Sequence, residues 1–237
     1  MTHRHLRQVI DVAETAAARL EIPTTMVTLH RDLQHAKMPD GRSLRGPRQH
    51  SLRWGAFLLV YGQIEGFFGE VLGYRDEKNR TLPLNPDKIR DVAMKEHAVD
   101  LFSQNWGLRT RTLRGKRGNR SDWETYIGTR RIGDYLSDMK SLRNLLTHGG
   151  DPSMATNGSG AFWLLQKKRN AQEGDDDENR RVSMRLMGVE GFIQASTDLM
   201  AQTILAYGGS LEDVPDWPEP ERSKPSTEEK PNLPLIP

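Results

Sequence analysis

Two stretches of helical periodicity in this sequence each end in a glycine pair. In the first, Met139, Leu142 and Leu146 recur at helical spacing before Gly149-Gly150. In the second, apolar residues recur at i, i+3 and i+4 over 189–207, before Gly208-Gly209. A glycine directly after an apolar helical stripe supplies the left-handed residue that ends a helix. The pattern predicts a mainly α-helical chain, with one helix over 122–148 and another over 189–207.

The distribution of proline, glycine and charge divides the 237 residues into four parts. We predict an N-terminal helical arm over 1–36, interrupted at Ile22-Pro23, and a linker over 37–50 that contains two prolines and two glycines. Residues 51–209 are predicted to form one helical domain. Over 210–237, seven of the thirteen prolines lie among Glu, Lys and Ser. Such a segment buries little apolar surface, so this tail is predicted to be disordered.

The residue content excludes several classes of chemistry. Without cysteine there is no disulfide, no thiolate nucleophile and no cysteine-zinc site. The seven histidines are scattered, so we expect no metal and no cofactor. The N-terminus lacks an apolar signal core, and the longest uncharged apolar run, 54–64, is too short to span a bilayer. We therefore expect a cytoplasmic protein with no membrane partner. The net charge of +2 alone indicates no nucleic-acid partner.

A carboxylate interrupts the most apolar predicted helix, over 51–74. Glu65 lies in the middle of the stripe formed by large apolar residues such as Phe57, Tyr61 and Phe68. An unpaired carboxylate in such a setting is unfavourable by several kcal/mol. Either Glu65 reaches solvent at the helix edge, or it forms a bidentate salt bridge with Arg143. The same helix carries five glycines, which favours the close approach of another backbone.

The next helix is predicted over 86–106, with Asn85 as its N-cap. A basic segment connects it to the helix over 122–148. Residues 101–121 contain no acidic side chain. The cations of this segment alternate with small and polar residues. They are Arg109, Arg111, Arg114, Lys116, Arg117 and Arg120. This composition predicts an exposed mobile loop. It is either a solvated segment or a surface that holds an RNA backbone through charge.

A β-hairpin is predicted between the helix over 122–148 and the last helix. Residues 161–167 and 181–187 are each suited to a strand, and the acidic residues 170–179 between them suit a solvated hairpin tip.

Polar side chains fill the arc of the helix over 122–148 that lies opposite its apolar stripe. Asn144 and His148 stand one turn apart, whereas Arg143 lies about 140° from His148 around the helix axis. One helix cannot easily direct Arg143 and His148 at the same atom. Two copies related by a twofold axis could form one pocket with two arginines and two histidines. Alternatively, the arc is an ordinary solvated face.

The sequence Arg143-Asn144-Leu145-Leu146-Thr147-His148 resembles the R-x4-H signature of HEPN-domain ribonucleases. The resemblance covers roughly 51–209 and implies a HEPN-like helical bundle, here with the β-hairpin inserted between the motif helix and the last helix. It implies metal-independent RNA cleavage by the 2′-hydroxyl, in a site shared by a homodimer. Arg143, His148 and Asn144 would be the catalytic residues, and Glu65 would match the acidic residue that often orients the motif arginine. Such domains often act as toxins or antiviral defence effectors, silenced by an antitoxin or another regulatory partner.

A second function is compatible with the sequence, and a third has less support. The motif face could hold two subunits together in a non-catalytic dimer or adaptor. Nucleotide binding without hydrolysis lacks support, because the sequence has no glycine-rich phosphate loop followed by Lys-Ser/Thr.

Overall fold

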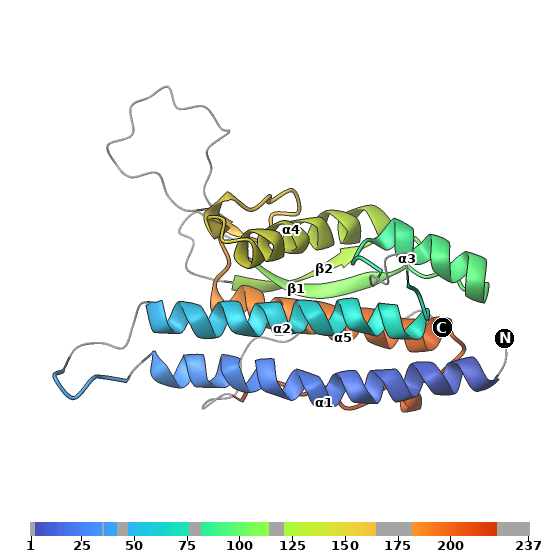
Figure 1. Cartoon of the computed structure of the whole chain (residues 1–237), viewed down its shortest axis with the longest axis horizontal. Helices are drawn as coiled ribbons and strands as arrows, with labels where there is room; N and C mark the ends of the chain where they lie inside the picture. The colour runs from blue at the N-terminus through green and yellow to red at the C-terminus, as the bar shows by residue number, and fades with distance from the viewer. Residues whose placement is uncertain are drawn as a thin grey trace, which may run out of the picture.

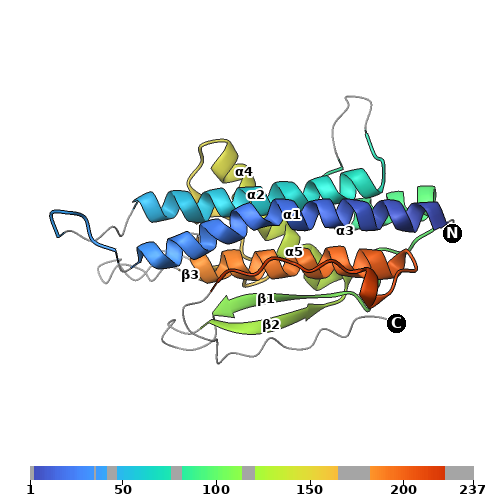
Figure 2. The same ribbon diagram turned by 90° about the horizontal axis from the view of Figure 1, so that it is seen from below.

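A computed structural model of the chain describes residues 3–34, 36–41, 47–75, 82–113, 121–164 and 182–221. These residues form five α-helices and two small antiparallel sheets of two strands each, which confirms a mainly α protein. Three long helices, α1 (His3–Leu33), α2 (Pro47–Val71) and α5 (Leu186–Ala206), lie side by side (Figures 1 and 2). The core between them contains close aromatic contacts, such as Phe57 with Phe192, whose ring centroids are 5.2 Å apart.

Helix α1 runs without interruption through Pro23, which corrects the predicted break. A proline inside a helix loses one hydrogen bond and crowds the preceding turn. Here the residues on both sides of it are held by tertiary packing, because Leu20 and Val27 are fully buried in the common core. The segment predicted as an arm therefore packs along α2 and α5 (Figure 1).

A β-hairpin replaces much of the predicted basic loop. Strand β1 (Gly107–Leu113) pairs with β2 (Ser121–Ile127) and lies along α5 (Figure 2). The approach is closest at Gly191 of α5, where an added Cβ would lie 2.4 Å from the backbone nitrogen of Arg111. Only glycine allows this contact without displacement of the strand.

The helix that carries the motif, α4 (Thr129–Thr147), begins later than predicted because 121–127 is a strand. Gly128, with φ of 89°, turns the chain from β2 into α4. The predicted end is confirmed: Gly149 has φ of 71°, and the Gly150 N–H donates to the carbonyl of Leu145 at 2.8 Å. This is the bond of a Schellman C-cap.

The helix predicted over 86–106 is shorter. The cap at Asn85 is confirmed by its side chain, which accepts from the Lys88 N–H at 3.0 Å. Helix α3 spans Pro86–Val92 and continues only as a π-helix, Ala93–His97, before Ala98 takes a left-handed conformation with φ of 55°.

The hairpin predicted after the motif helix is present, but only as a pair of very short strands. Strands β3 (Trp163–Leu164) and β4 (Val182–Ser183) form an antiparallel pair, and the predicted acidic tip lies outside the described residues. A short 3-10 helix, η2 (Pro152–Met154), precedes β3. Helix α5 begins three residues earlier than predicted and ends at the predicted glycine pair, where the Gly209 N–H donates to the Ile204 carbonyl at 3.0 Å.

The first part of the tail, which was predicted to be disordered, packs against α1. After the 3-10 helix η4 (Leu211–Asp213), Val214 and Trp217 pack against the core. The Arg31 guanidinium donates to the carbonyl of Glu221 at 2.8 Å, and the Glu221 N–H donates to Thr28 Oγ1 at 3.1 Å. The prediction of disorder is wrong for 211–221, and residues 222–237 lie outside the described part.

Within the described ranges, we find no helix with the length and apolar character needed to cross a lipid bilayer.

Candidate active site

The polar arc of α4 is accessible, as the sequence predicts. Met139 and Leu142 are buried in the core, whereas Arg143 and Asn144 are half-buried and His148 is exposed. The stripe of apolar residues therefore fixes which side of α4 faces solvent. The motif side chains lie where a second molecule or a polynucleotide can reach them.

Arg143 is held by three neighbours. Its Nη1 donates to Asn144 Oδ1 at 3.0 Å, and its guanidinium carbon lies 5.4 Å from the ring centroid of Tyr61 on α2. Its Nη2 lies 3.5 Å from Glu65 Oε2. The predicted pairing of Glu65 with Arg143 is confirmed, but the predicted bidentate geometry is wrong. A separation of 3.5 Å is an ion pair, longer than an N–H···O hydrogen bond.

Helix α2 supplies the two residues on which Arg143 rests. Tyr61 and Glu65 are one turn apart, so both side chains face α4. Burial raises the pKa of the Tyr61 hydroxyl, and the nearby Glu65 carboxylate raises this pKa further, while Arg143 lowers it. Tyr61 is therefore a neutral surface for the guanidinium. The Glu65 side chain is 19% exposed and that of Arg143 is 36% exposed, so the cation keeps access to solvent.

His148 is the C-cap residue of α4, and its backbone N–H donates to the Asn144 carbonyl at 3.0 Å. The Asn144 side chain contacts Arg143, so in the described protomer it orients the arginine. Arg143 and His148 remain on different sides of the polar arc, consistent with the predicted angle between them.

Two of the six predicted RNA-binding cations are engaged within the fold. Arg109 on β1 pairs with Asp198 on α5 at 2.5 Å, and the guanidinium of Arg111 donates to Glu190 at 3.1 Å. The Arg111 side chain is 4% exposed, so its placement does not suit contact with RNA. The other four cations, Arg114, Lys116, Arg117 and Arg120, lie outside the described residues.

Sequence reasoning missed a carboxylate that positions the segment after α4. Asp138 is buried and accepts from the backbone N–H groups of Gly158 at 3.0 Å and Ser159 at 2.8 Å, and from the Ser159 hydroxyl at 2.6 Å. A signal was present, because Asp138 lies directly beside Met139 on the buried side of α4. A carboxylate in such a place needs partners, as Glu65 does.

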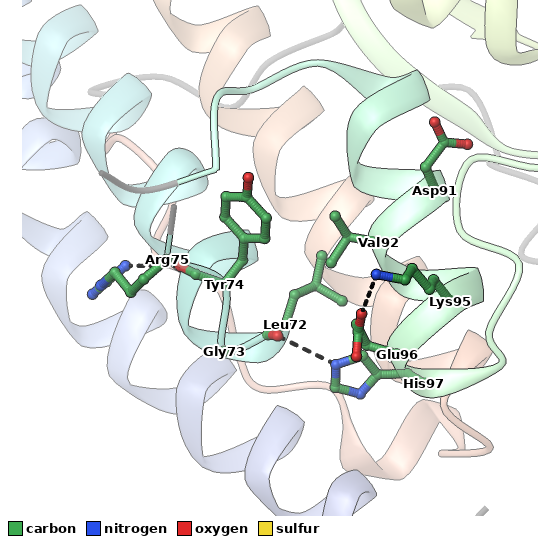
Figure 3. Close-up of a pocket in the computed structure, with 9 residues that line it drawn as sticks. All are labelled: Leu72, Gly73, Tyr74, Arg75, Asp91, Val92, Lys95, Glu96 and His97. Carbon is green, nitrogen blue, oxygen red and sulfur yellow. Dashed lines mark hydrogen bonds and ion pairs between the residues drawn. The ribbon is translucent and has the colours of Figure 1, made fainter. Parts of the chain in front are cut away.

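Two cavities lined by described residues lie away from the motif. One, of about 570 Å³, lies between the end of α2 and the π-helix after α3 (Figure 3). Its wall carries the Lys95–Glu96 ion pair and His97, whose Nε2 lies 3.3 Å from the Leu72 carbonyl oxygen. Another, of about 270 Å³, lies between α1 and 218–221.

Comparison with known proteins gives no further assignment: no protein-family model, no curated protein and no solved structure matches this chain.

Proposed function

We propose that the protein is a metal-independent endoribonuclease of the HEPN type, active as a homodimer. The observation that supports this most is the state of the motif: Arg143 is fixed by Glu65, Asn144 and Tyr61, while His148, on the other side of the polar arc, is exposed at the end of α4. A fixed guanidinium and a free imidazole are the groups that phosphoryl transfer requires.

In the proposed reaction, the 2′-hydroxyl of the RNA attacks the adjacent phosphorus. His148 of one copy accepts the proton of that hydroxyl, and His148 of the other donates a proton to the departing 5′ oxygen. The P–O5′ bond breaks, which leaves a 2′,3′-cyclic phosphate and a 5′-hydroxyl. The arginines stabilise the extra negative charge on the pentacoordinate phosphorus. A twofold arrangement supplies both histidines, which one copy of α4 cannot.

The four cations between β1 and β2, Arg114, Lys116, Arg117 and Arg120, are proposed to hold the RNA backbone through charge. A nuclease of this kind would act as a toxin or a defence effector, and an antitoxin or regulatory partner would restrain it.

The test is incubation of total RNA with the purified protein in EDTA. Wild type is expected to cleave RNA, and His148→Ala is expected to lose at least about a hundredfold in rate while it stays folded and dimeric. Thr147→Ala is the matched control, since among the described residues the Thr147 hydroxyl bonds only to carbonyls of its own helix, those of Arg143 and Asn144. It should cleave at nearly the wild-type rate.

Two results would exclude the proposal. Cleavage that requires Mg²⁺, or that continues at a site with a single 2′-deoxy substitution, indicates another chemistry. A wild-type protein that cleaves no RNA, with a dimer weakened by His148→Ala, indicates the adaptor instead.

A further inference from the structure

The last described residues of the chain cover part of α1. Residues 214–221, which we call the strap, run along α1 toward its C-terminal end (Figure 2). Before the strap, an added Cβ at Gly209 would lie 3.1 Å from the side chain of Leu6. At the far end of the strap, the Glu221 N–H donates to Thr28 Oγ1 at 3.1 Å. Both ends of this segment are therefore placed against α1.

A cavity of about 270 Å³ lies between the strap and α1. Helix α1 lines it with one face, since the four residues that it contributes lie at helical spacing: Glu21, Thr24, Thr25 and Thr28. The strap contributes Pro218, Glu219 and Glu221. The ionisable side chains among these residues are all carboxylates, and the other polar side chains are all hydroxyls. The lining is therefore suited to a cation that donates hydrogen bonds.

Two of the three carboxylates have no cation beside them in the described part of the chain. Glu219 interacts through charge with Arg109 of β1. The carboxylates of Glu21 and Glu221, in contrast, form no ion pair and no hydrogen bond with other described residues. Arg31, one turn beyond the cavity, is neutralised by an ion pair with a glutamate of α5. A bound cation would offset the repulsion between the carboxylates of the cavity.

The Thr24 hydroxyl lacks the partner that other helical threonines have. Thr15, Thr28 and Thr203 each donate to the carbonyl four residues earlier. Thr24 is only 5% exposed, yet its Oγ1 has no hydrogen bond among the described residues. A buried polar group without a partner costs about 1–3 kcal/mol. Because threonine uses two χ1 rotamers in helices, this hydroxyl can turn toward a donor in the cavity without breaking another bond.

The positions along α1 indicate a linear cation with a charge at each end. Glu21 and Thr28, the helix residue bonded to Glu221, are seven residues apart, about 10 Å along the axis. Thr24 and Thr25 lie between them. The volume of about 270 Å³ is just below the range of about 300–1,000 Å³ usual for ligand pockets, so the occupant is slender.

We propose that the cavity binds a linear polyamine, with ammonium groups paired to Glu21 and Glu221 and an N–H group donated to Thr24. An ammonium carries three donors and no acceptor, which matches a lining of carboxylates and hydroxyls. The bound polyamine joins the strap to α1, because one carboxylate belongs to each. The site is independent of the proposed nuclease, since neither α1 nor the strap carries a residue proposed for cleavage.

Spermidine is the probe, measured on the full chain by titration calorimetry and by thermal unfolding, with NaCl of equal ionic strength as the reference. Wild type is expected to bind one spermidine. At about ten times its Kd, spermidine should raise the Tm by about 3–5 °C. Glu21→Gln and Glu221→Gln should each weaken binding about tenfold, because each removes a charge-assisted hydrogen bond.

Thr24→Val tests the hydroxyl, because valine keeps the shape of the side chain and removes its oxygen. This variant should bind spermidine several-fold more weakly. Without spermidine its Tm should be at least that of wild type, since a buried hydroxyl without a partner is replaced by a methyl group. Spermidine affinity equal to that of wild type would remove Thr24 from the site and leave the proposal without its buried acceptor.

Glu212→Gln is the matched control, because it removes the same charge from an exposed position outside the cavity. Glu212 closely follows Gly209, which lies beside Leu6, about 22 Å along α1 from Glu21. This variant should bind spermidine as wild type does. If Glu21→Gln and Glu221→Gln bind as tightly as Glu212→Gln, the attraction is diffuse and the proposal is overturned. Calorimetry that detects no spermidine site would overturn it as well.

Calcium distinguishes an amine site from a metal site, because carboxylate and hydroxyl oxygens also suit hard cations. The described residues contain no group of three or more acidic or histidine side chains placed to hold a metal ion. CaCl₂ at equal ionic strength should therefore leave the spermidine affinity within about twofold. Displacement of spermidine by Ca²⁺ would overturn the assignment to an amine. None of these measurements depends on RNA cleavage, so the polyamine site and the proposed nuclease can fail separately.

Discussion

Carboxylates on otherwise apolar helix faces organise this molecule at the scale of single residues. Glu65 holds Arg143, Asp138 holds 158–159, and Asp198 and Glu190 hold the arginines of β1. In each case the burial of the carboxylate is compensated by cations or backbone N–H groups. Among the arginines in these pairs, Arg143 is the most exposed, at 36% against 23% for Arg109 and 4% for Arg111. In the proposed nuclease, the pair with Glu65 orients this accessible guanidinium.

The pairing predicts that Glu65 and Arg143 act together in cleavage. Glu65→Gln should slow RNA cleavage about tenfold, because it frees the guanidinium from its position above Tyr61. Arg143→Lys should slow cleavage more, since an ammonium cannot replace the planar fork. The double variant is expected to be no slower than Arg143→Lys alone. Single-turnover rates of the four proteins measure this, and strictly additive losses would show that the two residues act independently.

At the scale of elements, the contact of β1 with α5 depends on Gly191. In Gly191→Ala, the new methyl group would meet the backbone of Arg111, and the hairpin would move away from the ion pairs that join it to α5. We expect this change to lower the free energy of unfolding by about 3 kcal/mol, measured by urea denaturation.

Gly66→Ala on α2 is the matched substitution. Among the described residues, no atom outside the adjoining turns of α2 lies within 4 Å of the position of its Cβ, so this change should raise the free energy of unfolding by about 0.5–1 kcal/mol. A Gly191→Ala protein as stable as wild type would mean that β1 does not pack closely on α5 in solution.

The elements also show how far local sequence predicts this fold. The ends of α4 and α5 were predictable because Gly149 and Gly208 take left-handed conformations that few other residues adopt. The hairpin was missed because the arginines of β1 suggest a solvated loop until their partners on α5 are known. Pro23 suggested a helix break because the hydrogen bond that proline removes is a local loss, visible in the sequence. The packing of Leu20 and Val27 that offsets this loss is tertiary.

Local sequence likewise predicts only part of the candidate site. The accessible arc of α4 and the Glu65–Arg143 contact were predictable from the period of the helix and from one carboxylate on an apolar face. The convergence of His30 and Arg53 was not predictable. It depends on the antiparallel packing of α1 on α2 and on the placement of the N-terminus of α5 beside them.

At the scale of the whole molecule, α2 connects the two charged regions. Arg53, near its start, helps to lower the pKa of His30, and Glu65, three turns later, pairs with Arg143 of the motif on α4. The stability of the whole fold should respond to pH through His30, because this ring is buried.

His30 gives this response a definite sign. Its pKa in the folded protein is lowered by burial and then by Arg53, whereas the unfolded chain titrates near pH 6.5. Below about pH 6.5 the unfolded chain binds a proton that folded His30 does not, so the free energy of unfolding decreases as the pH falls. Above about pH 7 the contribution is fully present. Urea denaturation at about pH 7.5, 6.5 and 5.5, above the range in which most carboxylates titrate, should record this decrease.

Substitution of His30 should remove much of the decrease. We expect a smaller pH dependence in His30→Gln than in wild type. An identical pH dependence in wild type and His30→Gln would show that His30 is uncoupled from folding.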